Sequence, residues 1–283
     1  MASFTNFATL SYNGGTTNSN IVTGEILEAL TAVKTAVSAN YSAGDRITYA
    51  LSLVNTGTAA ITDYTVTDNL GGYTVGANTV YPLAYSAGTV RYYINGVLQT
   101  APTVTAGPPL TVTGLTVPAG GSAVLIYETT ATPVAPLATG SSITNTATIT
   151  GGGLTNPITA QATVETATSA ELSISKALSP TTVTENGQIT YTFVISNTGN
   201  TEATATGNVV VTDTFAPILR NIAVTYNGTA WTEGTNYTYN AATGVFTTLA
   251  GQITVPAASF TQNTDGTFTV TPGTATLVIT GTV

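Results

Sequence analysis

The stretch Phe4-Thr-Asn-Phe-Ala-Thr-Leu10 recurs in the middle of the chain as Ile143-Thr-Asn-Thr-Ala-Thr-Ile149. Each copy is followed by a glycine-rich turn and a second run that ends in glutamate. Alternating apolar residues on both sides of such a turn predict a β-hairpin. The middle copy closes a unit that begins near residue 29, whereas the first copy follows nothing. We therefore expect residues 1–28 to be the last hairpin of a unit whose other strands lie elsewhere.

The remainder of the chain also repeats itself. Ile47-Thr-Tyr49 recurs as Ile189-Thr-Tyr191, and Tyr64-Thr-Val-Thr-Asp68 recurs as Val209-Val-Val-Thr-Asp213. Repetition at this period indicates two copies of one domain. Each copy reads as seven or more short strands separated by Gly, Asn and Pro turns, which predicts an all-β fold of two tandem immunoglobulin-like sandwiches.

These repeats predict three segments. Residues 1–28 form a donor hairpin, residues 29–168 form the first sandwich, and residues 169–283 form the second. The second copy reaches only the strand that precedes the closing hairpin of the first copy. We therefore expect the second sandwich to be incomplete and to accept a strand.

Composition excludes several classes of function. Charged residues make up 6% of the chain and the net charge is −8, which argues against nucleic acid as a partner. With no Cys and no His, disulfides and the usual zinc, copper and haem ligands are excluded, and we expect no metal or cofactor. No apolar run is long enough to insert into a membrane. A Thr- and Asn-rich β protein without cysteine is typical of an extracellular location, yet no signal peptide is visible. We therefore expect an extracellular or spore-surface protein that is released by lysis of the mother cell.

Two sets of polar residues stand on apolar strand faces. Residues two apart on a strand share a face, and by this test each of the following shares its face with apolar neighbours. The first set is Lys34, Asp68 and Asn145, and the second is Lys176, Asp213 and Asn6. Lys34 and Lys176 are the only lysines. Because an unpaired buried ammonium costs several kcal/mol, two buried lysines in so weakly charged a chain need an explanation.

The favoured explanation is an autocatalytic isopeptide bond. Burial lowers the pKa of a lysine and raises that of an aspartate. A neutral Lys34 or Lys176 can then attack an asparagine carboxamide while Asp68 or Asp213 shuttles protons to the departing ammonia. Glu128 is an alternative shuttle in the first sandwich. A buried Lys–Asp salt bridge with asparagine as a hydrogen-bond partner uses the same residues and remains the other interpretation.

The strands that carry these residues resemble a known bacterial family. The segments Ser173-Ile-Ser-Lys176, Val209-Val-Val-Thr-Asp213 and Ile143-Thr-Asn145 are similar to the conserved-repeat domain called domain of unknown function eleven. The resemblance implies immunoglobulin-like repeats of cell-surface proteins and of the ribbon-like appendages of clostridial spores. The Lys, Asp and Asn set also resembles isopeptide-bonded domains of Gram-positive pilins and adhesins. The chain departs from surface members in showing no signal peptide or sorting signal.

The displaced hairpin predicts a partner. A sandwich that lacks strands exposes unpaired backbone and an open core, which is a template for strand addition. We expect Phe4, Asn6, Ala8 and Leu10 to enter the second sandwich of a neighbouring copy, where Asn6 meets Lys176 and Asp213. A head-to-tail contact that does not close produces a filament, which makes the partner a homopolymer. A closed ring and a fold-back within one chain remain alternatives.

Two other classes of function remain. A surface adhesin or glycan-binding module would use the lone Trp231 together with some of the 14 tyrosines. Trp231 stands in a predicted turn and is more often a packing residue there. An enzyme acting on a diffusible substrate is disfavoured, because no His, Cys or paired-carboxylate cleft is visible in the sequence.

Overall fold

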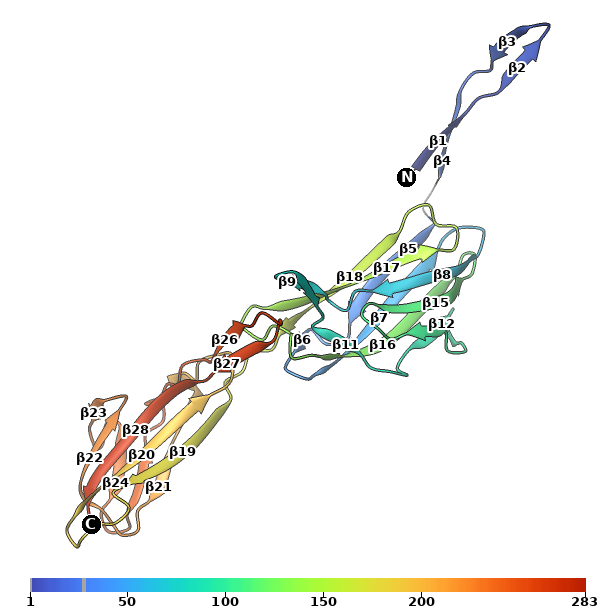
Figure 1. Cartoon of the computed structure of the whole chain (residues 1–283). Coiled ribbons are helices and arrows are strands. Elements are labelled where there is room, and N and C mark those ends of the chain that lie inside the picture. The colour runs from blue at the N-terminus through green and yellow to red at the C-terminus, as the bar shows by residue number, and fades with distance from the viewer. Residues whose placement is uncertain (1, 27–28) are drawn as a thin grey trace.

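The computed structural model describes residues 2–26 and 29–283. Strands form its regular structure, and the described residues contain one short 3-10 helix, η1 (Ala205–Gly207), and no α-helix. Figure 1 shows an elongated molecule with a slender hairpin at one end, then one β-sandwich, then a second whose last residue lies at the opposite end. No described helix is long and apolar enough to cross a bilayer.

The first sandwich consists of two sheets that face each other across a common core. One sheet has the order β13 (Val97–Leu98), β12 (Arg91–Ile94), β16 (Ser122–Ala131), β7 (Arg46–Asn55) and β5 (Leu30–Ala36), with β11 (Leu83–Tyr85) also paired to β16. The other has the order β14 (Thr103–Thr105), β15 (Leu110–Val117), β8 (Ile61–Asp68), β17 (Ser142–Gly151), β18 (Ile158–Thr166) and β6 (Asn40–Tyr41). A small ribbon, β9 (Tyr73–Val75) and β10 (Asn78–Val80), stands at one end.

The second sandwich repeats most of this arrangement. Its larger sheet has the order β23 (Thr229–Trp231), β22 (Arg220–Tyr226), β28 (Gly273–Thr282), β20 (Gln188–Asn197) and β19 (Leu172–Ser179), which matches β13-β12-β16-β7-β5 strand by strand. Its smaller sheet has the order β21 (Thr212–Thr214), β25 (Val245–Thr248) and β24 (Tyr237–Asn240). An additional hairpin, β26 (Ser259–Gln262) and β27 (Phe268–Thr271), precedes β28.

The second sandwich lacks the two strands that close the first. In the first sandwich, β8 pairs with β15 on one side and with the closing hairpin β17–β18 on the other. The corresponding strand β21 pairs with β25 only, and none of the described strands pairs with its other edge. The prediction of two immunoglobulin-like sandwiches, the second without its closing hairpin, is confirmed. The boundaries at residues 28 and 168 stay predictions.

The missing strands change the burial of the core. In β5 every second residue faces inward, and β18 lies beside it. All residues of the corresponding strand β19 are exposed, including the apolar Leu172, Ile174 and Leu178. The sequence places an apolar row on both strands, but only the first sandwich has the second layer that covers it. The second sandwich therefore exposes apolar surface that its own strands do not bury.

The N-terminal hairpin shares the register of the closing hairpin β17–β18 in its β1–β4 part, and its pairing shifts by one residue in its β2–β3 part. It contains β1 (Ala2–Asn6), β2 (Thr9–Tyr12), β3 (Gly15–Asn18) and β4 (Val22–Ile26). Asn6 pairs with Val22 as Asn145 pairs with Ala162. Phe4 and Leu10 are 54% and 63% exposed, whereas their counterparts Ile143 and Ile149 are buried. The β1–β4 part thus has the pairing of a core hairpin, while the apolar side chains of the hairpin remain exposed.

Candidate functional site

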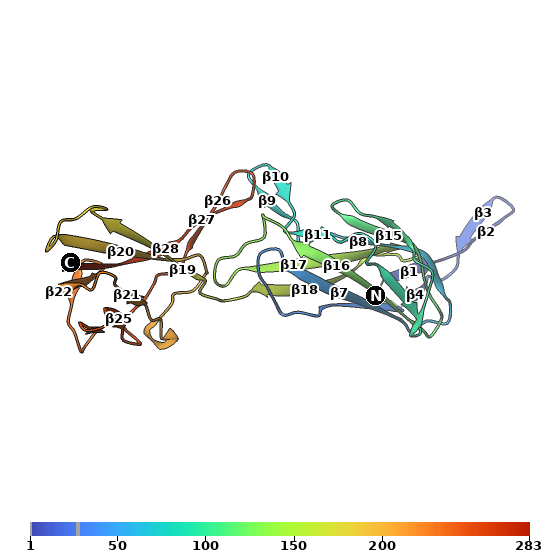
Figure 2. The ribbon, with the colours of Figure 1, turned by 90° about the horizontal axis from the view of Figure 1, so that it is seen from below.

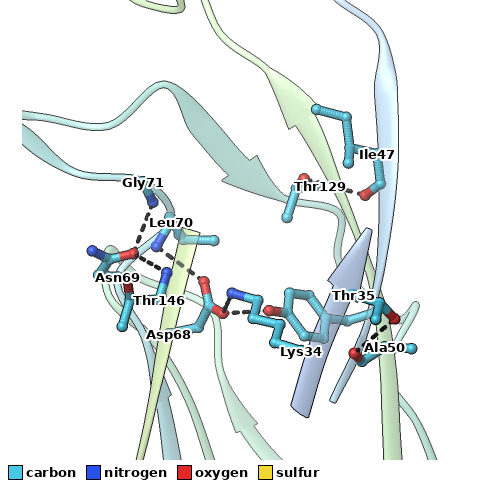
Figure 3. A network of polar contacts seen from close by, with 11 residues as sticks. Lys34, Thr35, Ile47, Ala50, Asp68, Asn69, Leu70, Gly71, Thr129 and Thr146 are labelled. Carbon is cyan, nitrogen blue, oxygen red and sulfur yellow. Dashed lines mark hydrogen bonds and ion pairs between the residues drawn. The ribbon is translucent and has the colours of Figure 1, made fainter. Parts of the chain in front are cut away.

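The two facing sheets of the first sandwich bring Lys34 and Asp68 together in its core. Lys34 extends from β5, and Asp68 stands at the end of β8 in the opposite sheet. Lys34 Nζ lies 2.5 Å from Asp68 Oδ2, and the two side chains are 0% and 1% exposed. Figure 3 shows this contact next to the turn of Asn69 and Leu70, where the Leu70 N–H donates to Asp68 Oδ1 at 3.0 Å.

Asn145 lies beside this pair on the neighbouring strand. In the register of β17 and β8, Ala147 is opposite Asp68, and Asn145 is two residues away on the same face. The turn residue Asn69 fixes this register, because its Oδ1 accepts the Thr146 N–H at 2.8 Å. Asn145 is fully buried, and its amide oxygen and nitrogen have no hydrogen-bond partner among the described residues. A buried carboxamide without partners is costly unless another role compensates.

Two tyrosines complete the surroundings of the lysine. The Tyr127 hydroxyl donates to Asp68 Oδ2, and the Tyr127 ring stacks on Tyr49 with 5.8 Å between centroids. Lys34 Nζ lies 4.8 Å from the centroid of the Tyr49 ring. Sequence reasoning missed both tyrosines. The signal was present, since each shares a strand face with buried apolar residues, but a tyrosine on such a row usually has only a packing role.

Burial decides the ionisation of this cluster. It lowers the pKa of the Lys34 ammonium from 10.5 to about 8, although the Asp68 carboxylate raises it. Burial also raises the pKa of the Tyr127 phenol well above its usual value, and Asp68 adds to this rise. Tyr127 therefore stays protonated and available as a donor. Because the lysine pKa is only about one unit above neutrality, the neutral amine is within reach at ordinary pH.

The second sandwich contains an open version of the same pair. Lys176 Nζ contacts Asp213 Oδ2, yet these side chains are 40% and 18% exposed. Lys176 also lies over Tyr191, which corresponds to Tyr49. The position of Tyr127 is taken by Ile279, since Tyr127 pairs with Tyr49 and Ile279 pairs with Tyr191. The sequence test placed Lys176 on a core-facing row, and its exposure follows from the missing strands above it.

The remaining predicted residues lie elsewhere. Asn6 and the donor residues Phe4, Ala8 and Leu10 are exposed on the N-terminal hairpin, which projects from the first sandwich (Figure 1). Glu128 lies on the outward face of β16, and its Oε2 is 3.6 Å from Arg46 Nη1. It therefore does not face the buried Lys34–Asp68 pair, and the prediction of Glu128 as an alternative proton shuttle is wrong.

Trp231 stacks on Tyr226 with 4.8 Å between ring centroids, as a packing residue does. Among the described residues, no three His, Cys, Asp or Glu side chains form a group that could hold a metal.

We expect Tyr127→Phe to lower the free energy of unfolding of the first sandwich by about 1.5–3 kcal/mol, the usual value of a hydrogen bond to a charged group. Tyr49→Phe is the matched control, because none of the described residues bonds the buried Tyr49 hydroxyl. Its removal should be neutral or stabilising. Urea unfolding of both variants in an Asn145→Ala background measures the difference without covalent chemistry. Equal effects of the two substitutions would contradict the role of the Tyr127 hydrogen bond.

We also expect the first sandwich of an Asn145→Ala variant to gain stability as the pH rises from 8 to about 9.5. The folded-state pKa of Lys34, about 8, lies below the 10.5 of the unfolded chain. Between pH 8 and about 9.5 the unfolded chain keeps the Lys34 proton that the folded protein has lost. The free energy of unfolding therefore rises by about 1.4 kcal/mol per pH unit, or about 2 kcal/mol in all. Above about pH 10 the buried tyrosines reverse the trend.

Urea titrations at each pH measure this gain, and Lys34→Met in the same background should abolish it. A flat profile in the Asn145→Ala protein would show that Lys34 keeps an ordinary pKa.

Comparisons with known proteins return solved structures only. No family model matches the sequence, and no curated protein matches it. The membership in the conserved-repeat family therefore stays a prediction.

The solved structures share little sequence with the chain. A variant of the major pilin subunit of Bacillus cereus has a TM-score of 0.39 and 15% identity, over 96% of this chain and 73% of that one. The pilus backbone protein of Streptococcus pneumoniae has a TM-score of 0.36 and 12% identity, over 86% and 55%. The N-terminal domain of a Streptococcus gordonii adhesin has a TM-score of 0.36 and 14% identity, over 48% and 32%.

The chain thus spans about a third of the adhesin domain and just over half of the pneumococcal structure. With TM-scores below 0.5, these similarities carry no function to the chain, and the function must be argued from its own residues.

Proposed function

We propose that the chain is a structural subunit of an extracellular or spore-surface filament. Each subunit inserts its N-terminal hairpin into the open second sandwich of the next, and the joint is then locked by a Lys176–Asn6 isopeptide bond. A Lys34–Asn145 bond locks the first sandwich internally. The observation that carries this proposal is the unpaired edge of β21 beside an exposed Lys176–Asp213 pair, in a chain that holds an unburied copy of the hairpin that would cover both.

The register of the closing hairpin gives the register of the inserted one. In the first sandwich Ala147 pairs with Asp68, which places Asn145 next to Lys34 and Asp68. By the same pairing Ala8 would lie opposite Asp213, and Asn6 would then reach Lys176 of that subunit. Phe4 and Leu10 would fill the positions that Ile143 and Ile149 occupy. Burying each large apolar side chain contributes about 1.5–3 kcal/mol.

The chemistry balances without a cofactor. Asp68 takes a proton from the Lys34 ammonium, and the neutral Nζ adds to Cγ of Asn145. Asp68 then returns its proton to the amide nitrogen, the Cγ–N bond breaks, and ammonia leaves with the proton lost by the new secondary amide. The products are one amide bond and one ammonium ion, and Asp68 ends ionised. In the second sandwich, Lys176, Asp213 and Asn6 of the neighbouring copy would take the same roles.

The shape of the molecule favours a filament over a fold-back. The N-terminal hairpin and the β21 edge lie at opposite ends of the elongated chain, with the first sandwich between them (Figure 1). A donor at one end and an acceptor at the other produce head-to-tail contacts, which continue indefinitely unless the rotation between subunits closes a ring.

Charging the inward face of the hairpin tests this assembly. We expect Phe4→Asp with Leu10→Asp to abolish polymers, because both carboxylates would be forced into the acceptor core. Thr5→Asp with Thr9→Asp is the matched control, since the counterparts of these threonines, Thr144 and Thr148, face away from the core. Sedimentation and electron microscopy read out the result. Polymers that survive the inward charges, or that are lost equally with the outward ones, would exclude hairpin donation.

A further inference from the structure

One asparagine side chain bonds to both sides of the joint between the two sandwiches inside the chain. Asn200 Nδ2 donates to the carbonyl oxygens of Leu137 at 2.9 Å and Ala167 at 2.8 Å, while its Oδ1 accepts the Ser169 N–H at 3.0 Å. The Asn200 backbone oxygen also accepts a bond from the Thr139 hydroxyl at 2.6 Å. Asn200 therefore ties the second sandwich to the linker and to the first sandwich together.

A second contact across this joint comes from the hairpin β26–β27, here named the brace hairpin. It leaves the second sandwich and reaches the ribbon β9–β10 at the near end of the first, as Figure 2 shows. Gln262 Nε2 donates to the Tyr73 hydroxyl at 2.8 Å. Gly266 lies so close to Val80 that a Cβ at this glycine would stand 2.7 Å from Val80 Cγ1. The brace hairpin therefore limits how far the two sandwiches can bend.

The corresponding end of the first sandwich can be identified residue by residue. Asn55 Nδ2 donates to Pro118 O at 3.0 Å, as Asn197 Nδ2 donates to Pro256 O at 3.0 Å. Each asparagine also accepts, at 2.9 Å, the N–H of the glycine two residues later. Counting from these anchors, the counterpart of Asn200 is Thr58. The counterpart of the brace hairpin is the short turn at residues 119–121.

We propose that this end of the first sandwich, formed by residues 56–58 and 118–121, is the surface that meets the second sandwich of the preceding copy, and that it forms a hinge. The proposal rests on the proposed assembly. An inserted N-terminal hairpin leads through residues 26–29 into β5, just as the closing hairpin leads through residues 166–171 into β19. The joint between subunits therefore occupies the same place in the repeat as the joint inside each subunit.

The two joints differ in the side-chain contacts and the hairpin that connect one sandwich to the other. Thr58 is exposed and has a single hydroxyl hydrogen to donate, so it cannot reproduce the two Nδ2 donations and the Oδ1 acceptance of Asn200. The turn at residues 119–121 is too short to reach a neighbouring sandwich. The linker between subunits, residues 26–29, is also shorter than the linker inside a subunit, residues 166–171. A shorter linker limits the distance between the two sandwiches but not the rotation of one relative to the other. Since relative motion of domains is the default where few contacts cross, a filament would consist of stiff two-sandwich rods joined by hinges.

Imaging of full-length filaments by cryo-electron microscopy tests the difference. The bend angles at successive joints should alternate between a narrow distribution and one about twofold wider or more. In the variant Asn200→Thr with Gln262→Ala, both joints should show the wide distribution. Thr261→Ala is the control, because this neighbouring side chain is exposed and forms no hydrogen bond with the described residues of the first sandwich.

A second measurement examines the internal joint without a filament. The chain has no cysteine, so Val97→Cys and Val245→Cys provide two unique spin labels, one on each sandwich, in the Phe4→Asp, Leu10→Asp background. Their distance distribution should be narrow, and it should broaden in the Asn200→Thr, Gln262→Ala variant.

An unchanged distribution, or equal bending at successive joints, would overturn the hinge while leaving the assembly intact. Failure of the full-length chain to form any filament would overturn the assembly itself and the hinge with it.

Discussion

Boiling the assembled protein in denaturant should leave a ladder of covalent multimers, and Asn6→Ala should collapse this ladder to a single monomer band. The substitution removes the carboxamide that Lys176 of the neighbouring subunit would attack, but it leaves the apolar side chains of the hairpin in place. Polymers should therefore still form in the absence of denaturant. Denaturing gels measure the covalent step, and electron microscopy of the same sample measures the assembly.

Asn145→Ala is the matched control for this result. This variant should keep the ladder and lack only the internal bond. Formation of that bond lowers the intact mass of a monomer by one ammonia, about 17 Da, so the Asn145→Ala monomer should not show this loss. The Asn6→Ala monomer should retain that loss, and the Asn6→Ala, Asn145→Ala double variant should have its full formula mass. A wild-type monomer of full mass with no ladder would exclude both bonds, and the buried Lys34–Asp68 pair would then be a salt bridge.

Asp68→Ala should cost the first sandwich about 3–5 kcal/mol, because it leaves the buried Lys34 ammonium without its partner. The experiment is done in the Asn145→Ala background, so that the loss of the bond does not contribute. Asp213→Ala should cost only about 0–1 kcal/mol in the unassembled chain, since Lys176 is 40% exposed and remains hydrated. Urea unfolding that separates the transitions of the two sandwiches measures both effects.

Replacing both members of the buried pair identifies the cause. Lys34→Met with Asp68→Leu should recover most of the stability lost in Asp68→Ala, because an apolar pair of similar volume needs no charge partner. If the double variant is as unstable as Asp68→Ala, the loss comes from packing at Asp68 and not from the orphaned ammonium.

The sequence was sufficient to predict the repeat and to predict which side chains of its strands face inward. The period of two along β5, β8 and β17 places Lys34, Asp68 and Asn145 inward, and all three are buried where the structure brings two sheets together. The same pattern on β19 places Lys176 inward as well. Its exposure could not be read from β19 itself, because burial depends on strands that pair elsewhere.

Contacts made across long sequence separations escaped prediction. Tyr127 reaches Asp68 from a different sheet, and no local pattern distinguishes it from its counterpart Ile279 in the second sandwich. Asn200 stands in the loop after β20, where no alternation of apolar and polar residues predicts the direction of its side chain. Its three partners belong to the other sandwich and to the linker, so only the tertiary structure reveals its role.

The placement of the lysines near the start of each sandwich has a mechanical consequence. In a filament with both bonds, a pull along the axis would enter a subunit at Asn6, follow the backbone to Lys34, cross to Asn145 and leave through Lys176. Residues 35–144 and 177–283 lie outside this path, so their sheets would carry no tension. The path contains the two copies of the repeated hairpin and the segments that lead from them to Lys34 in β5 and Lys176 in β19. Within it, the two hairpins are the segments that a pull would unzip, and the covalent bonds would limit how far the filament could stretch.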